Sequence, residues 1–320
     1  MASFFTKNIF IYNFFKFTKN VILNKYLGEK MNHFYKKYTP YVFLLPSFVL
    51  LMVFFFIPFF QTVALSFQDY SNNIYQPNWV ALQNYIEILK NPDFYKILGN
   101  TFLYLIVAVP FLVTFPLFLA ILINQKIKCQ NLYKILIYFP VIVSIVAAAI
   151  AFKWLYAQDG ILNFLVSKFG LDAVGWLTDP NVALYSVAFV TIWKGVGYYM
   201  MIYLAALMGA PNDLYEACDV DGAGFIKKHL TVTIPHLMPT IALVSTISSI
   251  SALKVFAEIY VMTKGGPLNS TKTIVYYIYE RAFEHLDLGV ASACAVILLI
   301  IVMLFSILNI LVFEKDKYKL

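Results

Sequence analysis

Charged side chains are rare within the apolar stretches of this chain, and the few that occur there could act on a solute. Lys194 lies in the middle of an apolar stretch, beside Trp193 and one turn before Tyr198. A charge at mid-bilayer costs about 2.5–3.5 kcal/mol on insertion scales, so Lys194 is expected to face a bundle interior or a wet cavity. Because aromatic rings offer flat apolar faces and the Trp and Tyr rings also carry a polar group, Trp193, Lys194 and Tyr198 are candidates for lining a substrate pathway.

Lys254 and Glu258 form a second candidate site. They are four residues apart in a later apolar stretch, so on one α-helix they would share a face and neutralise each other. Such a pair could be structural or could line the same pathway, and both interpretations stay open. Lys153, near the end of another apolar stretch, is predicted to extend its ammonium group toward the membrane surface.

The residue types that enzymes use do not gather in this sequence. The pattern GxxxxGK[ST], which holds nucleotide phosphates and magnesium, is missing, and the glycine-rich run from Gly222 to Lys228 lacks its spacing. The four histidines are scattered, and the three cysteines show no CxxC or metal-ligand spacing. We therefore predict that the chain is not an enzyme and needs no cofactor or metal.

The polar stretch 213–235, DLYEACDVDGAGFIKKHLTVTIP, lies between two long apolar segments. A loop that only returns the chain to the bilayer needs few residues, whereas this one has helix formers, a glycine break and a basic pair. We predict a short helix over 213–221 with Asn212 or Asp213 as its N-cap, followed by a sharp turn at Gly222-Ala223-Gly224. This is the layout of a docking element for another protein, and a plain interfacial helix is the alternative.

The composition requires lipid around the chain. Hydrophobic residues make up 61% of the 320 residues and charged residues only 13%, with a mean hydropathy of +0.74, whereas a soluble domain carries about a quarter charged residues. A helix needs about 20 mainly apolar residues to cross the hydrocarbon core. Stretches of that length predict an all-α polytopic membrane protein with six core spans: 41–63, 97–123, 135–157, 182–208, 238–262 and 286–313.

The lysines determine the predicted orientation. Fifteen lie in the N-terminal arm 1–40, the connection after the second span, the loop 209–237 and the tail 314–320, whereas six Lys or Arg residues lie on the opposite side. Since cytoplasmic loops carry an excess of Lys and Arg, both termini and the 209–237 loop are predicted to be cytoplasmic. The net charge of +7 is therefore a topology signal and not a nucleic-acid-binding surface.

The N-terminal arm precedes a predicted six-helix domain that covers 41–313. Residues 8–23 are apolar but interrupted by two lysines, and no small-residue cleavage site follows them. A signal peptide needs an uninterrupted apolar core, so we predict an interfacial helix on the inner membrane surface instead. Met31 offers an alternative start, which would make 1–30 an extension.

Three loops on the predicted outer side, 64–96, 158–181 and 263–285, are longer than turns require. The first contains an amphipathic stretch from Trp79 to Leu89, with apolar residues at helical spacing. These loops either cap the helix ends or form a platform for an external partner or a substrate entrance, and the sequence favours neither interpretation.

Three sequence blocks resemble the carbohydrate class of permeases in binding-protein-dependent ABC importers, the type found in glycerol-3-phosphate, multiple-sugar and maltose systems. The family's cytoplasmic motif runs Glu-Ala-Ala, Asp-Gly-Ala and Leu-Pro, and this chain keeps its spacing with Cys218, His229, Val232 and Ile234 as departures. Ala257 stands where many relatives carry Asp, so a role for that carboxylate does not carry over. The matching blocks, within roughly 40–320, are Glu216-Ala217-Cys218 with Asp221-Gly222-Ala223 and Ile234-Pro235, then Lys254 to Pro267, then Asp287 to Ala293.

The resemblance implies the type I importer permease architecture and a set of partners. These are a second, homologous permease chain, two ATP-binding subunits on the cytoplasmic side and a solute-binding protein outside, in a bacterial-type cytoplasmic membrane. The chain would form half of an alternating-access pathway for a sugar or related polyol. The resemblance assigns ATPase coupling to Glu216, which would pair with a basic residue of an ATPase cleft, to Gly222, which would form the turn, and to Ala217, Asp221, Ala223 and Pro235.

Two other classes of protein fit part of the pattern. A secondary transporter or channel would have the same spans and need no ATPase, and a membrane enzyme would need a catalytic group that the spans do not show. The polar loop distinguishes them from the importer, because only a driven permease needs a docking element there.

Overall fold

The computed structural model describes residues 29–70, 77–125 and 127–314. The chain divides into two compact units, Met1–Gln61 and Thr62–Leu320. The interfacial helix predicted around 8–23 and the tail 315–320 lie outside the described residues.

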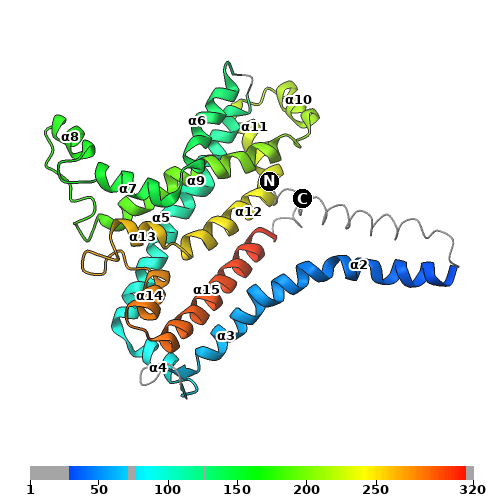
Figure 1. Ribbon diagram of the computed structural model, residues 1–320. Coiled ribbons are helices and arrows are strands. Elements are labelled where there is room, and N and C mark those ends of the chain that lie inside the picture. Colours follow the sequence, from blue (N-terminus) through cyan, green and yellow to red (C-terminus); the bar gives the residue numbers. More distant parts are fainter. Residues whose placement is uncertain (1–28, 71–76, 126, 315–320) are drawn as a thin grey trace, which may run out of the picture. The chain divides into compact units, whose positions relative to one another are not determined.

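The described elements are almost all helical, as the sequence predicts (Figure 1). The first unit contains α2 (Glu29–Leu51), the π-helical turn η1 (Met52–Phe56) and the start of α3 (Ile57–Leu65), in which the boundary between the units falls. The second unit continues, in chain order, with β1 (Gln68–Asp69), β2 (Asn78–Trp79), α4 (Gln83–Lys90), α5 (Pro92–Ile123), α6 (Gln130–Ile142), α7 (Ile145–Leu155), α8 (Ile161–Lys168), α9 (Ala183–Leu207), α10 (Asn212–Val220), α11 (Phe225–Lys228), η2 (His229–Thr233), α12 (Ile234–Leu253), α13 (Ala257–Met262), α14 (Ile274–Tyr279), η3 (Glu280–Glu284) and α15 (Leu288–Glu314).

The number of predicted spans agrees with the structure. In the described part of the chain, five helices are long and apolar enough to cross a membrane, and a bent helix pair brings the number to six. The five are Tyr38–Leu65, Pro92–Ile123, Ala183–Leu207, Phe225–Met262 and Leu288–Val312.

The third span differs from the single helix predicted over 135–157. It consists of α6 and α7, which meet at 94°. Val143 and Ser144 between them have extended backbone, with ψ of 134° and 136°. Pro140, which lacks an N–H and crowds the preceding turn, lies two residues before the end of α6. Hydropathy alone misses this break because the residues on both sides of it are equally apolar.

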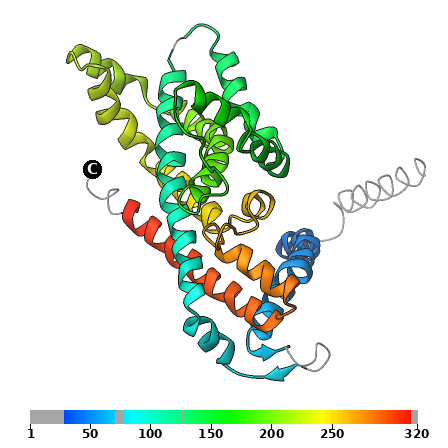
Figure 2. The same ribbon diagram turned by 90° about the vertical axis from the view of Figure 1, so that its left-hand side faces the viewer.

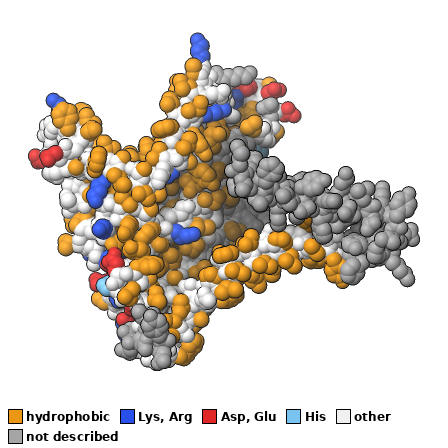
Figure 3. Space-filling view, in the orientation of Figure 1, with side chains coloured by type: hydrophobic (Ala, Val, Ile, Leu, Met, Phe, Trp, Pro, Cys, Tyr) orange, Lys and Arg blue, Asp and Glu red, His pale blue; other side chains and the backbone are white. Residues whose placement is uncertain are grey.

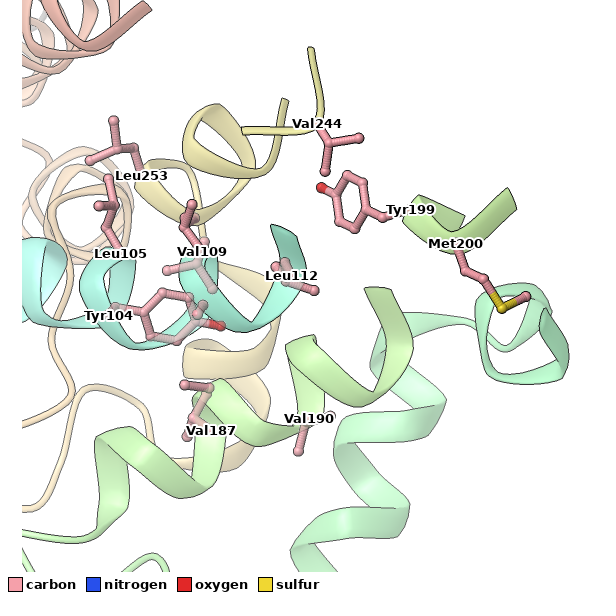
Figure 4. Close-up of a cluster of buried hydrophobic side chains, with 14 of the residues drawn as sticks. Tyr104, Leu105, Val109, Leu112, Val187, Val190, Tyr199, Met200, Val244 and Leu253 are labelled. Carbon is pink, nitrogen blue, oxygen red and sulfur yellow. The ribbon is translucent and has the colours of Figure 1, made fainter. Parts of the chain in front are cut away.

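The core of the second unit is formed by α5 packed against α9 and α12 (Figure 4). Tyr104, Met200 and Leu253 are fully buried in it, one from each helix. Lipid is as apolar as these side chains, so helix association in a membrane depends on close packing and on small residues that let backbones approach. Gly197 of α9 is such a residue, because a Cβ there would lie 2.3 Å from the carbonyl oxygen of Ile137 in α6.

The polar loop and the two loops around α4 and α14 lie at opposite ends of the second unit. In Figures 1 and 2, α10 lies at the upper end, whereas α4 and the two-stranded β1–β2 hairpin lie at the lower end. The predicted amphipathic stretch 79–89 is the helix α4, which buries Asn84 and Ile88, four residues apart, on one face.

Candidate functional site

The polar loop folds into a helix, a turn and a second helix. The predicted helix over 213–221 is α10, and the predicted turn is at Gly222, whose φ of +68° is in the left-handed region that favours glycine. The N-cap prediction is wrong: Pro211 occupies that position without a side-chain hydrogen bond, and Asn212 is already the first helical residue. Asp213 lies in the first turn, where its negative charge interacts favourably with the positive end of the helix dipole.

Four of the six residues that the sequence assigns to docking are exposed, and two of these four lie in α10. Glu216, Ala217, Asp221 and Gly222 are exposed, whereas Ala223 and Pro235 are half-buried. Among the described residues, the Glu216 carboxylate has no hydrogen-bond or salt-bridge partner. Figure 3 shows acidic side chains gathered over α10, next to basic side chains. An exposed, unpaired carboxylate on a short helix is available to a basic group of another protein.

The inward side of the same element is bonded to the start of the α12 span. The hydroxyl of Thr233 lies 2.8 Å from the Tyr215 hydroxyl and 2.7 Å from Nδ1 of His229. Lys228 forms a salt bridge with Asp219 of α10. A hollow of about 480 Å³ lies between this element and the ends of α5 and α9, and Asn124, Leu207 and Tyr215 line it. Neither Tyr215 nor Thr233 was predicted from the sequence, because neither belongs to the family motif.

Lys194 lies within the protein, as its mid-span position predicts. Its side chain is half-buried, and Nζ donates a 2.8 Å hydrogen bond to the carbonyl oxygen of Val141 in the last turn of α6. The last carbonyls of a helix have no partner within the helix and carry partial negative charge. The ammonium group therefore satisfies the end of α6 at the point where the third span bends.

Trp193 and Tyr198 lie on different faces of α9. The Trp193 ring packs on Phe152 of α7 with ring centroids 5.1 Å apart, so it belongs to the protein interior. The Tyr198 ring is 43% exposed and contacts Tyr199 edge-on. Trp193 and Tyr198 are five residues apart and so lie on different faces of the helix. Lys194 and Tyr198 are four apart and therefore share a face of α9, and Trp193 lies on another.

The predicted pairing of Lys254 with Glu258 is wrong. The α12 helix ends at Leu253 and α13 begins at Ala257, so the spacing of four does not place the two side chains on one helical face. Lys254 is exposed, whereas Glu258 is 8% exposed and accepts a 2.8 Å hydrogen bond from the Thr191 hydroxyl. Tyr104 lies 2.6 Å from the same hydroxyl and must donate to it, because the Thr191 proton is used on Glu258. Glu258 therefore joins α13 to α9 and α5.

An aromatic cluster lies beside the break between α12 and α13. Phe256 and Tyr260 stack at 5.4 Å, and Tyr279 of α14 lies 5.2 Å from each of them. Tyr276 of the same helix is buried, which raises the pKa of its hydroxyl to about 12, with the carboxylates of Glu284 and Glu280 adding to the shift. No group of His, Cys, Asp and Glu within the described residues could hold a metal ion.

These features define a helical membrane protein with six spans and a helix–turn–helix in one connecting loop. Residues 85–314 match the family described as "Binding-protein-dependent transport system inner membrane component", and the chain belongs to that family. It is therefore the permease component of an ABC importer, a membrane subunit without enzymatic activity, because ATP hydrolysis resides on a separate subunit in this family.

The relatives agree with this assignment over most of the chain. A probable ABC transporter permease protein of Bacillus subtilis, YurN, is 34% identical over 288 residues, which are 88% of this chain and 98% of the relative. The arabinooligosaccharide permease AraP of Halalkalibacterium halodurans is 33% identical, covering 85% of this chain and 86% of its own. The lactose permease protein LacF of Rhizobium radiobacter is 32% identical, covering 87% and 93%.

A solved structure has the same fold. A chain of a bacterial ABC transporter for import of the acidic polysaccharide alginate superposes with a TM-score of 0.78 at 23% identity, covering 90% of this chain and 99% of that chain. At this identity the likeness concerns the fold alone. The fold prediction, an importer permease of six core spans, is confirmed.

Proposed function

We propose that this chain forms half of the translocation pathway of an ATP-driven importer for a sugar or related polyol. A second, homologous permease chain forms the other half. Two ATP-binding subunits lie on the cytoplasmic side, one of them docked on residues 213–228, and a solute-binding protein docks outside. The observation that carries the proposal is the α10–turn–α11 element, with Glu216 exposed and unpaired and Gly222 in a left-handed turn. The names of the relatives, which include arabinooligosaccharide and lactose permeases, support a carbohydrate.

The charge distribution supports a cytoplasmic position for both termini and for the 209–237 loop. The membrane-spanning part extends over 41–313, between the N-terminal arm 1–40 and the tail 314–320. Within it, Trp193, Lys194, Tyr198, Lys254 and Glu258 remain our candidates for the pathway. Lys194 and Tyr198 have the strongest support, because they share one face of α9 and one of them is exposed.

Two glycine variants test the coupling function, one expected to break the turn and one expected to be tolerated. Gly222→Pro imposes a φ near −65° where the turn needs +68°, whereas Gly224→Ala is compatible with its φ of −64° and meets no atom within 4 Å. We expect Gly222→Pro to abolish ATP-dependent uptake and co-purification of the ATPase, and Gly224→Ala to retain both. Uptake that survives Gly222→Pro in a stably inserted chain would instead support a transporter that works without an ATPase.

The substrate class is tested with radiolabelled arabinotriose and lactose, given to membrane vesicles that contain the whole importer and its binding protein. Mass spectrometry of the complex extracted from native membrane identifies the partners. A P-loop ATPase and a second permease in that complex are the expected result, whereas recovery of this folded chain alone would contradict the proposal.

A further inference from the structure

Pro235 changes the helix that leads from the polar loop into the α12 span. A proline in a helix cannot donate to the carbonyl four residues earlier, and its ring crowds that carbonyl. The turn before it, η2, is accordingly π-helical: Ile234 N–H bonds the His229 carbonyl, five residues back. Residues five apart in a π-turn return toward one face, which α-helical spacing would not allow.

Thr233 at the end of this π-turn and Lys228, the residue just before it, both contact α10. Lys228 and Thr233, five residues apart, contact Asp219 and Tyr215, which are four apart on one face of α10. The outer contact is a salt bridge whose Asp219 side chain is 61% exposed, so it is screened by solvent. The inner contact is different, because Thr233 is fully buried and its hydroxyl has two partners.

The hydroxyl of Thr233 closes a chain of three polar groups. It has one proton, so it donates to one partner and accepts from the other. Tyr215 can donate to Thr233 while Thr233 donates to Nδ1 of His229, or the order can be reversed, and either order satisfies all three groups. Phe225 packs edge-on against the His229 ring at 4.3 Å and holds it in place. Opening this chain would leave a buried hydroxyl without a partner.

We propose that Tyr215 and Thr233 are positioning residues that fasten α10 to the first turn of the α12 span. A displacement of α10 is then passed to α12 as movement of one rigid body, with Gly222 as the turn that closes it. This inference rests on the proposed function in one respect, that a docked ATPase displaces α10. The rigidity of the α10–α12 connection is a property of this chain and can be measured separately.

The experiment measures the distance between α10 and α12 in the purified importer complex. Spin labels are placed at Leu214 and Leu243, both exposed, in a chain whose native cysteines are replaced by alanine. Distance distributions are recorded with and without ATP and vanadate. The test variant is Thr233→Val, which keeps the shape and loses the hydroxyl, and the control is Thr231→Val, an exposed threonine in the same π-turn.

The unmodified chain and Thr231→Val should show one narrow distance that ATP leaves unchanged. In Tyr215→Phe, the displaced population should rise about fivefold, the factor expected for one lost hydrogen bond of ordinary strength. In Thr233→Val, which also loses the contact with His229, it should rise at least as much. The double variant should add nothing beyond Thr233→Val, because that change already removes the contact with Tyr215. Because Thr233 lies outside the docking element 213–228, ATP hydrolysis in Thr233→Val should stay at its original rate, which a general loss of structure would lower.

Two outcomes would overturn the inference. In the first, Thr233→Val has the same narrow distribution as Thr231→Val. In the second, the variant loses distance order and ATP hydrolysis together, which indicates a general structural role. If no ATPase co-purifies with the unmodified chain, the proposed function fails, and the distance distribution of the chain alone still decides whether the fastening exists.

Discussion

The ammonium group of Lys194 donates a 2.8 Å hydrogen bond to the carbonyl oxygen of Val141, across the contact between α9 and α6. The acceptor is one of the last carbonyls of α6, just before the chain turns by 94° into α7. Irregular backbone at membrane depth is tolerated only where protein or water satisfies its polar groups. A charge that is costly in the bilayer thus compensates a backbone break that is also costly there.

The first prediction concerns this bond. Lys194→Met keeps the length of the side chain and removes the charge, leaving the end of α6 without its partner. We expect a loss of about 1.5–3 kcal/mol in stability, the range for hydrogen bonds to charged groups. Thermal unfolding in detergent measures it. Lys153→Met is the control, because Lys153 is exposed and its contact with Val261 is 3.5 Å long; equal losses in the two variants would contradict the role of Lys194.

A second prediction compares two glycine-to-alanine changes that should have opposite effects on stability. A Cβ at Gly197 would lie 2.3 Å from the Ile137 carbonyl, which forces α6 away from α9, whereas a Cβ at Gly99 in α5 meets nothing within 4 Å. We expect Gly197→Ala to cost about 1–3 kcal/mol through overpacking. Gly99→Ala should instead raise stability by up to about 1 kcal/mol, because alanine favours a helix more than glycine. If both variants shift the melting temperature in the same direction, α6 and α9 are packed less closely than described.

The third prediction concerns the partner of Glu258. The structure shows Thr191 in this role, whereas the sequence suggested Lys254. In a double-mutant cycle, Thr191→Val and Glu258→Gln should show a coupling of about 0.5–3 kcal/mol, because the two side chains are hydrogen-bonded. Lys254→Met and Glu258→Gln should be additive within about 0.5 kcal/mol, as expected for side chains without a shared contact. Urea unfolding of the three single variants and the two double variants measures both cycles, and a strong Lys254–Glu258 coupling would restore the original pairing.

Sequence reasoning identified the parts of this fold whose signals are local. The six apolar stretches follow from a length requirement that lipid imposes on every span. The turn at Gly222 follows from the one residue type that adopts a positive φ without strain. Glu216 could be assigned an outward position because it occupies a polar helix within a short motif.

Tertiary placement could not be predicted in the same way. The spacing of Lys254 and Glu258 suggests a pair only if one helix runs through both, and the break at residues 254–256 removes that condition. The bend of the third span depends on a carbonyl partner, Lys194, that lies more than fifty positions away. Thr233 has no signal of its own within the polar stretch 213–235, since its importance depends on the π-turn before Pro235.

The last prediction concerns the loop between α13 and α15. Lys272 Nζ lies 2.8 Å from both carboxylate oxygens of Glu280, and both side chains are largely shielded from solvent. The carbonyl of Lys272 also accepts a hydrogen bond from Asn100 of α5. The ion pair therefore fixes η3 to a segment that is itself attached to a span. Breaking the ion pair should increase the mobility of the loop on both sides of it.

We expect Lys272→Met to cost about 1–3 kcal/mol, less than a fully buried pair because solvent reaches this one in part. Hydrogen–deuterium exchange should rise over residues 263–287 and stay unchanged in α5 and α9. The exchanged double variant, Lys272→Glu with Glu280→Lys, should recover most of the protection, since it restores the attraction. Lys264→Met, an exposed lysine in the same loop, is the control. If the exchanged pair protects the loop no better than Lys272→Met alone, the loop is held by its backbone contacts and the ion pair has no structural role.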